Sequence, residues 1–152
     1  MRQLFLMLAF AMTSCNTVVE QNKTDEILTS APKTLSGTVR IKDELAEKAK
    51  GFRTIAFVFF RGENQLFGGQ ILQLEKDIDA KNGYEFKFDL NKVPHNLEMP
   101  TPEALTIKVR LAKSITQRED QPGDLIGLSR EVKVGQNDIR LVVDTIKGSI
   151  SK

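Results

Sequence analysis

The side chains best suited to metal or nucleophilic chemistry are the single cysteine, Cys15, and the single histidine, His95, which Met99 follows closely. Histidine with methionine suggests copper, but a blue-copper site requires two histidines and a cysteine thiolate. One cysteine is also too few for a disulfide within the chain or for a cysteine-based metal cluster. We therefore expect no metal site and no cofactor, and we expect His95 to lie in a solvated loop.

Catalytic patterns are not predicted either. No G-x-S-x-G element occurs, and the proline-rich segment around His95 gives a general base no rigid support. No C-x-x-C-H element is present for covalent haem attachment. Glu119, Asp120 and Asp124 are acidic, but their spacing does not fit a calcium loop, so we expect a solvated turn there. The sequence indicates a protein that is not an enzyme.

The first residues have the features of an export signal. A charged start, Met1–Gln3, precedes an apolar run, and Thr13 and Ser14 are small residues directly before Cys15. The apolar run is about half of the ~20 residues that cross a bilayer. We expect residues 1–14 to be a signal peptide; a buried cysteine in an uncleaved helix and an ordinary secretory signal are the alternatives.

The segment Met12-Thr13-Ser14-Cys15 resembles a bacterial lipobox, apart from methionine where leucine is usual. The resemblance implies cleavage before Cys15 and lipid on its thiol, with acyl chains such as palmitate that anchor the chain to a membrane. Asn16 follows, whereas an aspartate there resembles an inner-membrane retention signal. The expected location is therefore the cell envelope, facing the periplasm, with the outer membrane favoured over the inner.

Composition favours one folded domain. The chain has 152 residues, of which 40% are hydrophobic and 28% charged. Its 22 basic and 20 acidic residues are interleaved, so nothing indicates a nucleic-acid partner. We expect a lipidated flexible tether over residues 15–34, a folded domain over residues 35–146 and a short tail over residues 147–152.

Residues alternate between apolar and polar along most of the expected domain, which is typical of half-buried strands. The segment 54–60 is apolar on both faces and indicates a central strand. Gly68 and Gly69 indicate a turn or bulge before a strand over residues 70–74. The apolar members of the alternating strands form five rows: Leu35, Val39 and Ile41; Tyr84, Phe86, Phe88 and Leu90; Leu105, Ile107, Val109 and Leu111; Val132 and Val134; Ile139, Leu141 and Val143.

About seven strands separated by turn residues predict an antiparallel β-sandwich, immunoglobulin-like or cupredoxin-like. We expect one short helix over residues 44–50, capped by Asp43 and ended by Gly51. The phenylalanines could line a ligand slot, although their strand spacing favours a core: Phe57, Phe59, Phe60, Phe86 and Phe88.

Several segments, in order, resemble the C-terminal periplasmic β-domain of the H-type c-type cytochrome biogenesis factors. They are Ser36–Val39, Thr54–Arg61, Val109–Ser114 and Gln121–Gly127, and the resemblance extends from Ser36 to Asp144. It implies a non-catalytic part of an assembly that presents apocytochrome for haem attachment. The tetratricopeptide region and membrane helices of that family have no counterpart in this sequence.

The element QPGDLIG is the most specific part of the resemblance. It predicts a Pro-Gly turn in which Asp124 accepts from nearby backbone amides and Leu125 is an apolar plug. The candidate turn residues are Gln121, Pro122, Gly123, Asp124, Leu125 and Gly127.

A second candidate is the loop that joins two strands through His95, Leu97 and Met99, whose apolar residues could bind a protein partner. Two functions follow from these patterns. The first is a lipid-anchored binding or scaffold module with a protein partner, which the resemblance ties to cytochrome maturation. The second is a carrier of a small ligand or a metal in the cell envelope.

Overall fold

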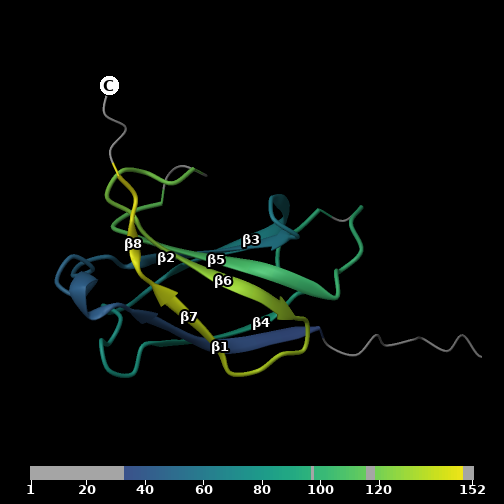
Figure 1. The fold of residues 1–152 in the computed structure, drawn as a ribbon, viewed down its shortest axis with the longest axis horizontal. Coiled ribbons are helices and arrows are strands. Elements are labelled where there is room, and N and C mark those ends of the chain that lie inside the picture. Colours follow the sequence, from purple (N-terminus) through teal and green to yellow (C-terminus); the bar gives the residue numbers. More distant parts are fainter. Residues whose placement is uncertain (1–32, 97, 116–118, 149–152) are drawn as a thin grey trace, which may run out of the picture.

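The computed structural model describes residues 33–96, 98–115 and 119–148, which form two packed β-sheets (Figure 1). One sheet has the order β3-β2-β5-β6-β8 and the other the order β4-β1-β7, which confirms the predicted all-β sandwich. In these residues no helix is long and apolar enough to span a bilayer. The strands are β1 (Thr34–Ile41), β2 (Thr54–Arg61), β3 (Gln65–Gln73), β4 (Tyr84–Asp89), β5 (Ala104–Ala112), β6 (Leu125–Lys133), β7 (Ile139–Val143) and β8 (Thr145–Ile146).

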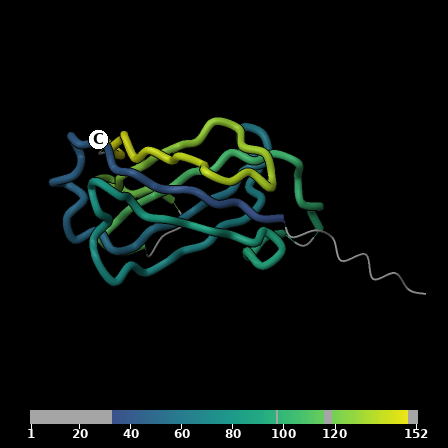
Figure 2. The backbone as a smooth tube through the Cα atoms, turned by 90° about the horizontal axis from the view of Figure 1, so that it is seen from below, coloured from purple at the N-terminus to yellow at the C-terminus, as the bar shows by residue number. Residues whose placement is uncertain are grey.

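One strand pair is parallel. Strand β1 lies between β4, with which it is antiparallel, and β7, with which it is parallel (Figure 2). All other pairs in the described residues are antiparallel. Gly37 permits the parallel contact, because a Cβ there would lie 2.0 Å from the carbonyl oxygen of Ile139. No hairpin joins β1 to β7, so the antiparallel direction that a hairpin imposes does not apply to them.

Aromatic side chains fill the space between the sheets. Phe57 lies 4.7 Å from Phe88 and 5.2 Å from Phe86 between ring centroids, and Phe59 lies 5.5 Å from Phe88. All four are buried, as the preferred interpretation of their spacing predicted. Phe60 is the exception, because it lies on the opposite face of β2 and is only half-buried.

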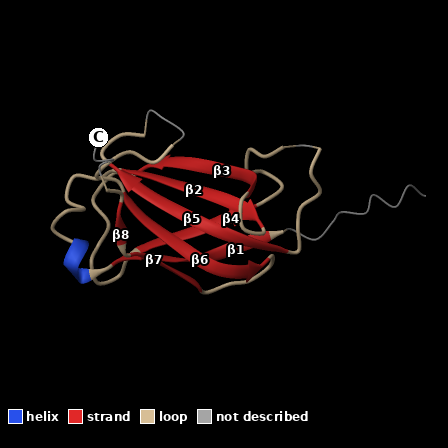
Figure 3. Cartoon of the chain, turned by 45° about the horizontal axis from the view of Figure 1, so that its top comes forward, coloured by secondary structure: helices blue, strands red, loops and turns tan. Residues whose placement is uncertain are grey.

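The two lateral sides of the sandwich differ. On one side the chain passes from β7 in the small sheet to β8 in the large sheet, and Asp144 donates its backbone N–H to the carbonyl oxygen of Ile126, 3.1 Å away (Figure 3). We call this the closed side. On the other side both sheets end in an edge strand, β3 and β4, joined through residues 74–83. We call this the open side.

The one short helix that we expected is present, but it begins one residue earlier and is shorter than residues 44–50. Residues Asp43–Leu45 form a single 3-10 turn, with a hydrogen bond from the N–H of Leu45 to the carbonyl oxygen of Lys42 at 2.8 Å. The side chain of Asp43 does not cap it. One turn without a cap does not overcome the cost of helix nucleation, and only Leu45 and Ala49 hold this segment on the core.

Strand β3 begins earlier than predicted. It starts at Gln65 and passes through Gly68 and Gly69, and the expected irregularity is a register shift opposite Phe59 and Phe60. A bulge adds a residue without ending the strand, so the glycines do not mark the end of pairing. The longer β3 forms one wall of the groove described below.

Candidate functional site

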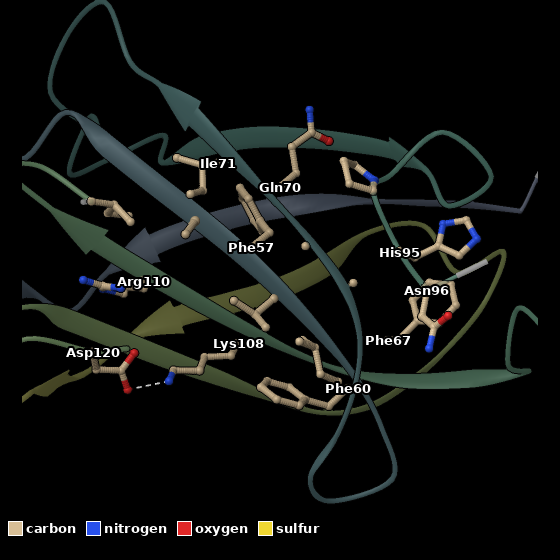
Figure 4. Close-up of a pocket in the computed structure, with 17 residues that line it drawn as sticks. Phe57, Phe60, Phe67, Gln70, Ile71, His95, Asn96, Lys108, Arg110 and Asp120 are labelled. Atoms are coloured by element: carbon tan, nitrogen blue, oxygen red, sulfur yellow. Dashed lines mark hydrogen bonds and ion pairs between the residues drawn. The ribbon is translucent and has the colours of Figure 1, made fainter. Parts of the chain in front are cut away.

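A groove of about 820 Å³ lies on the outer face of the five-stranded sheet (Figure 4). Its floor is the outward face of β2, formed by Ala56, Val58 and Phe60. These residues alternate with the core-facing Ile55, Phe57 and Phe59, because successive side chains of a strand point to opposite faces. A strand that is apolar on both faces therefore supplies both the core and the floor of the groove.

Two exposed apolar side chains stand on the β3 side of the groove. Leu66 is 56% exposed and Ile71 is 58% exposed, the values of side chains that remain largely in water. Gly69 lies between them, opposite Val58 in the strand register, and leaves the groove open above β2. Large exposed apolar residues gathered along a hollow are typical of interaction sites.

The imidazole of His95 closes one end of the groove. It stacks on Phe67 with ring centroids 4.9 Å apart and an interplanar angle of 15°, so His95 is half-buried and not the solvated residue that we expected. Its Nδ1 lies 2.6 Å from the carbonyl oxygen of Val93, which only accepts, so Nδ1 carries the proton. Gly68 makes the approach possible, since a Cβ there would lie 2.8 Å from the Cβ of His95.

The predicted partner-binding loop is thus only partly at this site. His95 lines the groove, Met99 is half-buried and does not line it, and Leu97 lies outside the described residues.

The wall opposite β3 contains an ion pair and an apolar residue. Lys108 of β5 contacts the carboxylate of Asp120, and both side chains are less than a quarter exposed. Ile115 lies in the same wall. Ile115 and Asp120, which both follow β5 in the chain, therefore lie over the outer face of the sheet and add depth to the groove.

A second ion pair lies almost entirely inside the protein. Arg110 of β5 donates from Nε to Oδ2 of Asp124 at 2.6 Å, and the two side chains are only 3% and 9% exposed. The same carboxylate oxygen accepts the backbone N–H of Gln121 at 2.7 Å. A buried carboxylate requires such partners, because removing a charge from water is costly.

The QPGDLIG element forms the turn that carries this carboxylate. The N–H of Asp124 donates to the carbonyl oxygen of Gln121 at 3.0 Å, and Gly123 has φ of +89°, which glycine adopts without strain. Pro122 is exposed and Leu125 is buried in the core. Gly127 belongs to β6, where a Cβ would lie 2.2 Å from the carbonyl oxygen of Val142.

Sequence reasoning missed both ion pairs. The alternation along β5 placed Lys108 and Arg110 on the strand face opposite the apolar row and predicted no partner for them, and we expected the acids Glu119, Asp120 and Asp124 to form a solvated turn. Part of the evidence for these ion pairs is present in the sequence. The two basic residues lie two positions apart on one face of the strand, and acidic residues follow in the connection to the next strand. What the pattern could not indicate is that Asp120 and Asp124 lie against the side chains of β5.

The groove is suited to binding an uncharged apolar group. Its cationic groups, Lys108 and Arg110, contact carboxylates of the same protein, and Asp120 and Asp124 are thereby engaged in ion pairs. Across the described residues, no three or more His, Cys, Asp or Glu side chains are grouped so that they could hold a metal ion. No family model, no curated protein and no solved structure matches the chain.

Proposed function

We propose that this chain is a lipid-anchored binding module of the bacterial cell envelope, whose binding surface is the groove on the outer face of the five-stranded sheet. The observation that carries the proposal is the groove of about 820 Å³ with Leu66 and Ile71 more than half exposed beside it. Full burial of such a side chain contributes roughly 1.5–3 kcal/mol, so covering the exposed parts of these two would favour association.

The anchor rests on the sequence of the first residues. Met12-Thr13-Ser14-Cys15 after a charged start and an apolar run supports lipid attachment at Cys15. Growth with labelled palmitate should give a labelled, membrane-bound protein, and Cys15→Ser should abolish the label and the membrane association. An unlabelled wild-type protein recovered in the soluble fraction would contradict the anchor.

The binding surface is tested by crosslinking in living cells. A photoreactive benzoylphenylalanine at Leu66 should give defined crosslinked products, whereas the same residue at Val142 should not. Val142 is the matched control, because it is a strand residue 46% exposed on the other sheet. Equal crosslinking from both positions would show that the groove is not a preferred binding surface.

The link to c-type cytochrome maturation is a narrower form of the same proposal. It is supported by the resemblance over Ser36–Asp144, with QPGDLIG as its most specific element. Deletion of the gene should lower the amount of haem-stained c-type cytochromes, and restoring the wild-type gene should recover it. Unchanged cytochrome levels would remove this role and leave a binding module with a different partner.

A further inference from the structure

Strand β3 is the edge of the five-stranded sheet, and one end of that edge already accepts an extended segment. Gly69 donates its N–H to the carbonyl oxygen of Pro94 at 3.2 Å, and the carbonyl oxygen of Phe67 accepts from Asn96 at 3.3 Å. The bridge between Gly68 and His95 is antiparallel. This edge is therefore accessible to a strand and is geometrically able to pair with one.

The rest of the β3 edge is open. Backbone groups alternate between the two sides of a strand, so Ile71 and Gln73 direct their N–H and C=O groups to the same side as Phe67 and Gly69. Among the described residues, β2 is the only strand that pairs with β3, and it lies on the other side. Unpaired edge groups of this kind form a template for a further strand.

The open edge separates two hollows. Gln70 and Ile71 line the groove on the outer face, while Gln70 and Leu72 line a second hollow of about 370 Å³ on the open side. The second hollow lies between the edges of β3 and β4, with Tyr84 and Phe86 in its wall. Side chains of an added strand would point alternately to the two faces and therefore toward the two hollows.

Charge indicates the kind of strand that fits. The charged side chains of the groove are joined in ion pairs, Lys108 with Asp120 and Arg110 with Asp124. The second hollow is lined by two acidic and two basic residues, Glu85, Asp89, Lys87 and Lys92, so its formal charge is balanced. With these pairs counted, neither hollow carries a net formal charge that would select a charged side chain, and both offer apolar contacts.

We propose that an extended, uncharged segment of another protein, with apolar residues at alternate positions, adds to the sheet as a strand along Gln70–Gln73. Backbone hydrogen bonds to Ile71 and Gln73 hold the segment, and alternate side chains occupy the two hollows. A lipid acyl chain has no groups with which to pair the edge. This inference rests on the proposed function, and it specifies the kind of partner that binds at the proposed site.

The experiment uses the full chain in lipid nanodiscs and a labelled, soluble decapeptide of alternating threonine and valine. We expect saturable binding, slower amide exchange at Ile71 and Gln73, and at least tenfold weaker binding of the same peptide with methylated backbone amides. Ile71→Pro should weaken binding at least tenfold, because proline removes the donor from an edge position that tolerates it. Val142→Lys should leave binding unchanged.

Other occupants give distinct results, each of which overturns the addition of a strand from another protein. Binding of a fluorescent fatty acid without binding of the peptide would keep the groove as the site of the proposed function but assign it to lipid. Self-association that Ile71→Pro abolishes would assign the edge to a second copy. Peptide binding that appears only in the Ile27→Asp/Leu28→Asp variant would assign the edge to the protein's own N-terminal residues.

Two further results separate the inference from the proposed function. If the peptide does not bind but Leu66 gives crosslinks, only the addition of a strand along β3 is overturned. If neither the peptide nor the fatty acid binds and Leu66 gives no crosslinks, both the strand addition and the proposed function are overturned.

Discussion

The closed and open sides of the sandwich differ in how the edges of the two sheets end. On the closed side, β7 and β8 carry the chain from one sheet to the other, and Gly127 lets β6 approach the backbone of Val142 closely. On the open side, β3 and β4 end the sheets without a strand between them. The closed side thus stabilises the fold, while the open side leaves backbone and apolar groups of β3 exposed, and it is there that we propose a partner binds.

The buried ion pair of Arg110 and Asp124 is connected to the strands of the closed side. Asp124, which Arg110 contacts, lies immediately before β6, and its carbonyl oxygen accepts the N–H of Lys147 just beyond β8 at 2.8 Å. Loss of this pair should therefore affect stability far more than loss of any exposed residue on the open side. The following predictions test that contrast.

Arg110→Met should have the largest effect. It leaves the Asp124 carboxylate buried without its cation, and we expect the free energy of unfolding to fall by roughly 3–5 kcal/mol. Urea denaturation followed by circular dichroism measures this, with Lys133→Met, at an exposed position of β6, as the control. The double variant Arg110→Met/Asp124→Asn should lose less free energy of unfolding than the sum of the losses in the two single variants. A loss below about 1 kcal/mol for Arg110→Met would show that the pair does not hold the closed side.

Gly127→Ala should have the second largest effect. The new Cβ would lie 2.2 Å from the carbonyl oxygen of Val142, so β6 and β7 must separate, at a cost of about 1–3 kcal/mol. The control is Gly148→Ala, where a Cβ would have no neighbour within 4 Å. Equal thermal unfolding midpoints for the two variants would mean that the close approach is not required.

Asp79→Asn, in the connection from β3 to β4 on the open side, should have a small and pH-dependent effect. The backbone N–H groups of Asn82 and Lys81 donate to the carboxylate and hold the pKa of Asp79 below its usual 3.8. A carboxyl whose pKa is lowered by folding stabilises the protein above its unfolded pKa, and this contribution is lost as pH falls through the folded pKa.

The unfolding midpoint of Asp79→Asn should therefore be slightly below wild type at about pH 6 and should approach it at about pH 2. Asp79→Ala, which removes the acceptor itself, should remain destabilised at both pH values. A difference between Asp79→Asn and wild type that does not change with pH would contradict the charge-based explanation.

Ile71→Lys should have the smallest effect on stability. Its side chain is 58% exposed, and we expect the free energy of unfolding to change by no more than about 0.5 kcal/mol, as for Val142→Lys. Only Ile71→Lys should weaken peptide binding. Destabilisation by more than about 1 kcal/mol would show that Ile71 packs as a structural residue and that the two sides do not differ as proposed.

The sequence predicted the elements whose pattern is local. Alternation identified β4 through Phe86 and Phe88, and the doubly apolar segment identified β2 as a central strand. Leu141 and Val143 are buried, as their spacing predicted. These predictions succeed because side-chain direction in a strand depends only on residue parity.

The features that the sequence did not predict are contacts between distant residues. The pairing of β1 with β7, the ion pair of Arg110 with Asp124 and the stacking of His95 on Phe67 each join segments whose meeting has no local signature. The short helix is shorter than predicted for a related reason, since Leu45 and Ala49 need core contacts but not a longer helix to make them.

For this protein, residue order alone determined the β-architecture, the apolar rows of the core and the expectation of lipid on Cys15. The tertiary structure alone decided that the second face of β2 becomes the floor of a groove and that the edge of β3 stays open. The physical reason is that burial of a strand face follows from its own alternation, whereas the covering of the opposite face depends on where a distant connection folds.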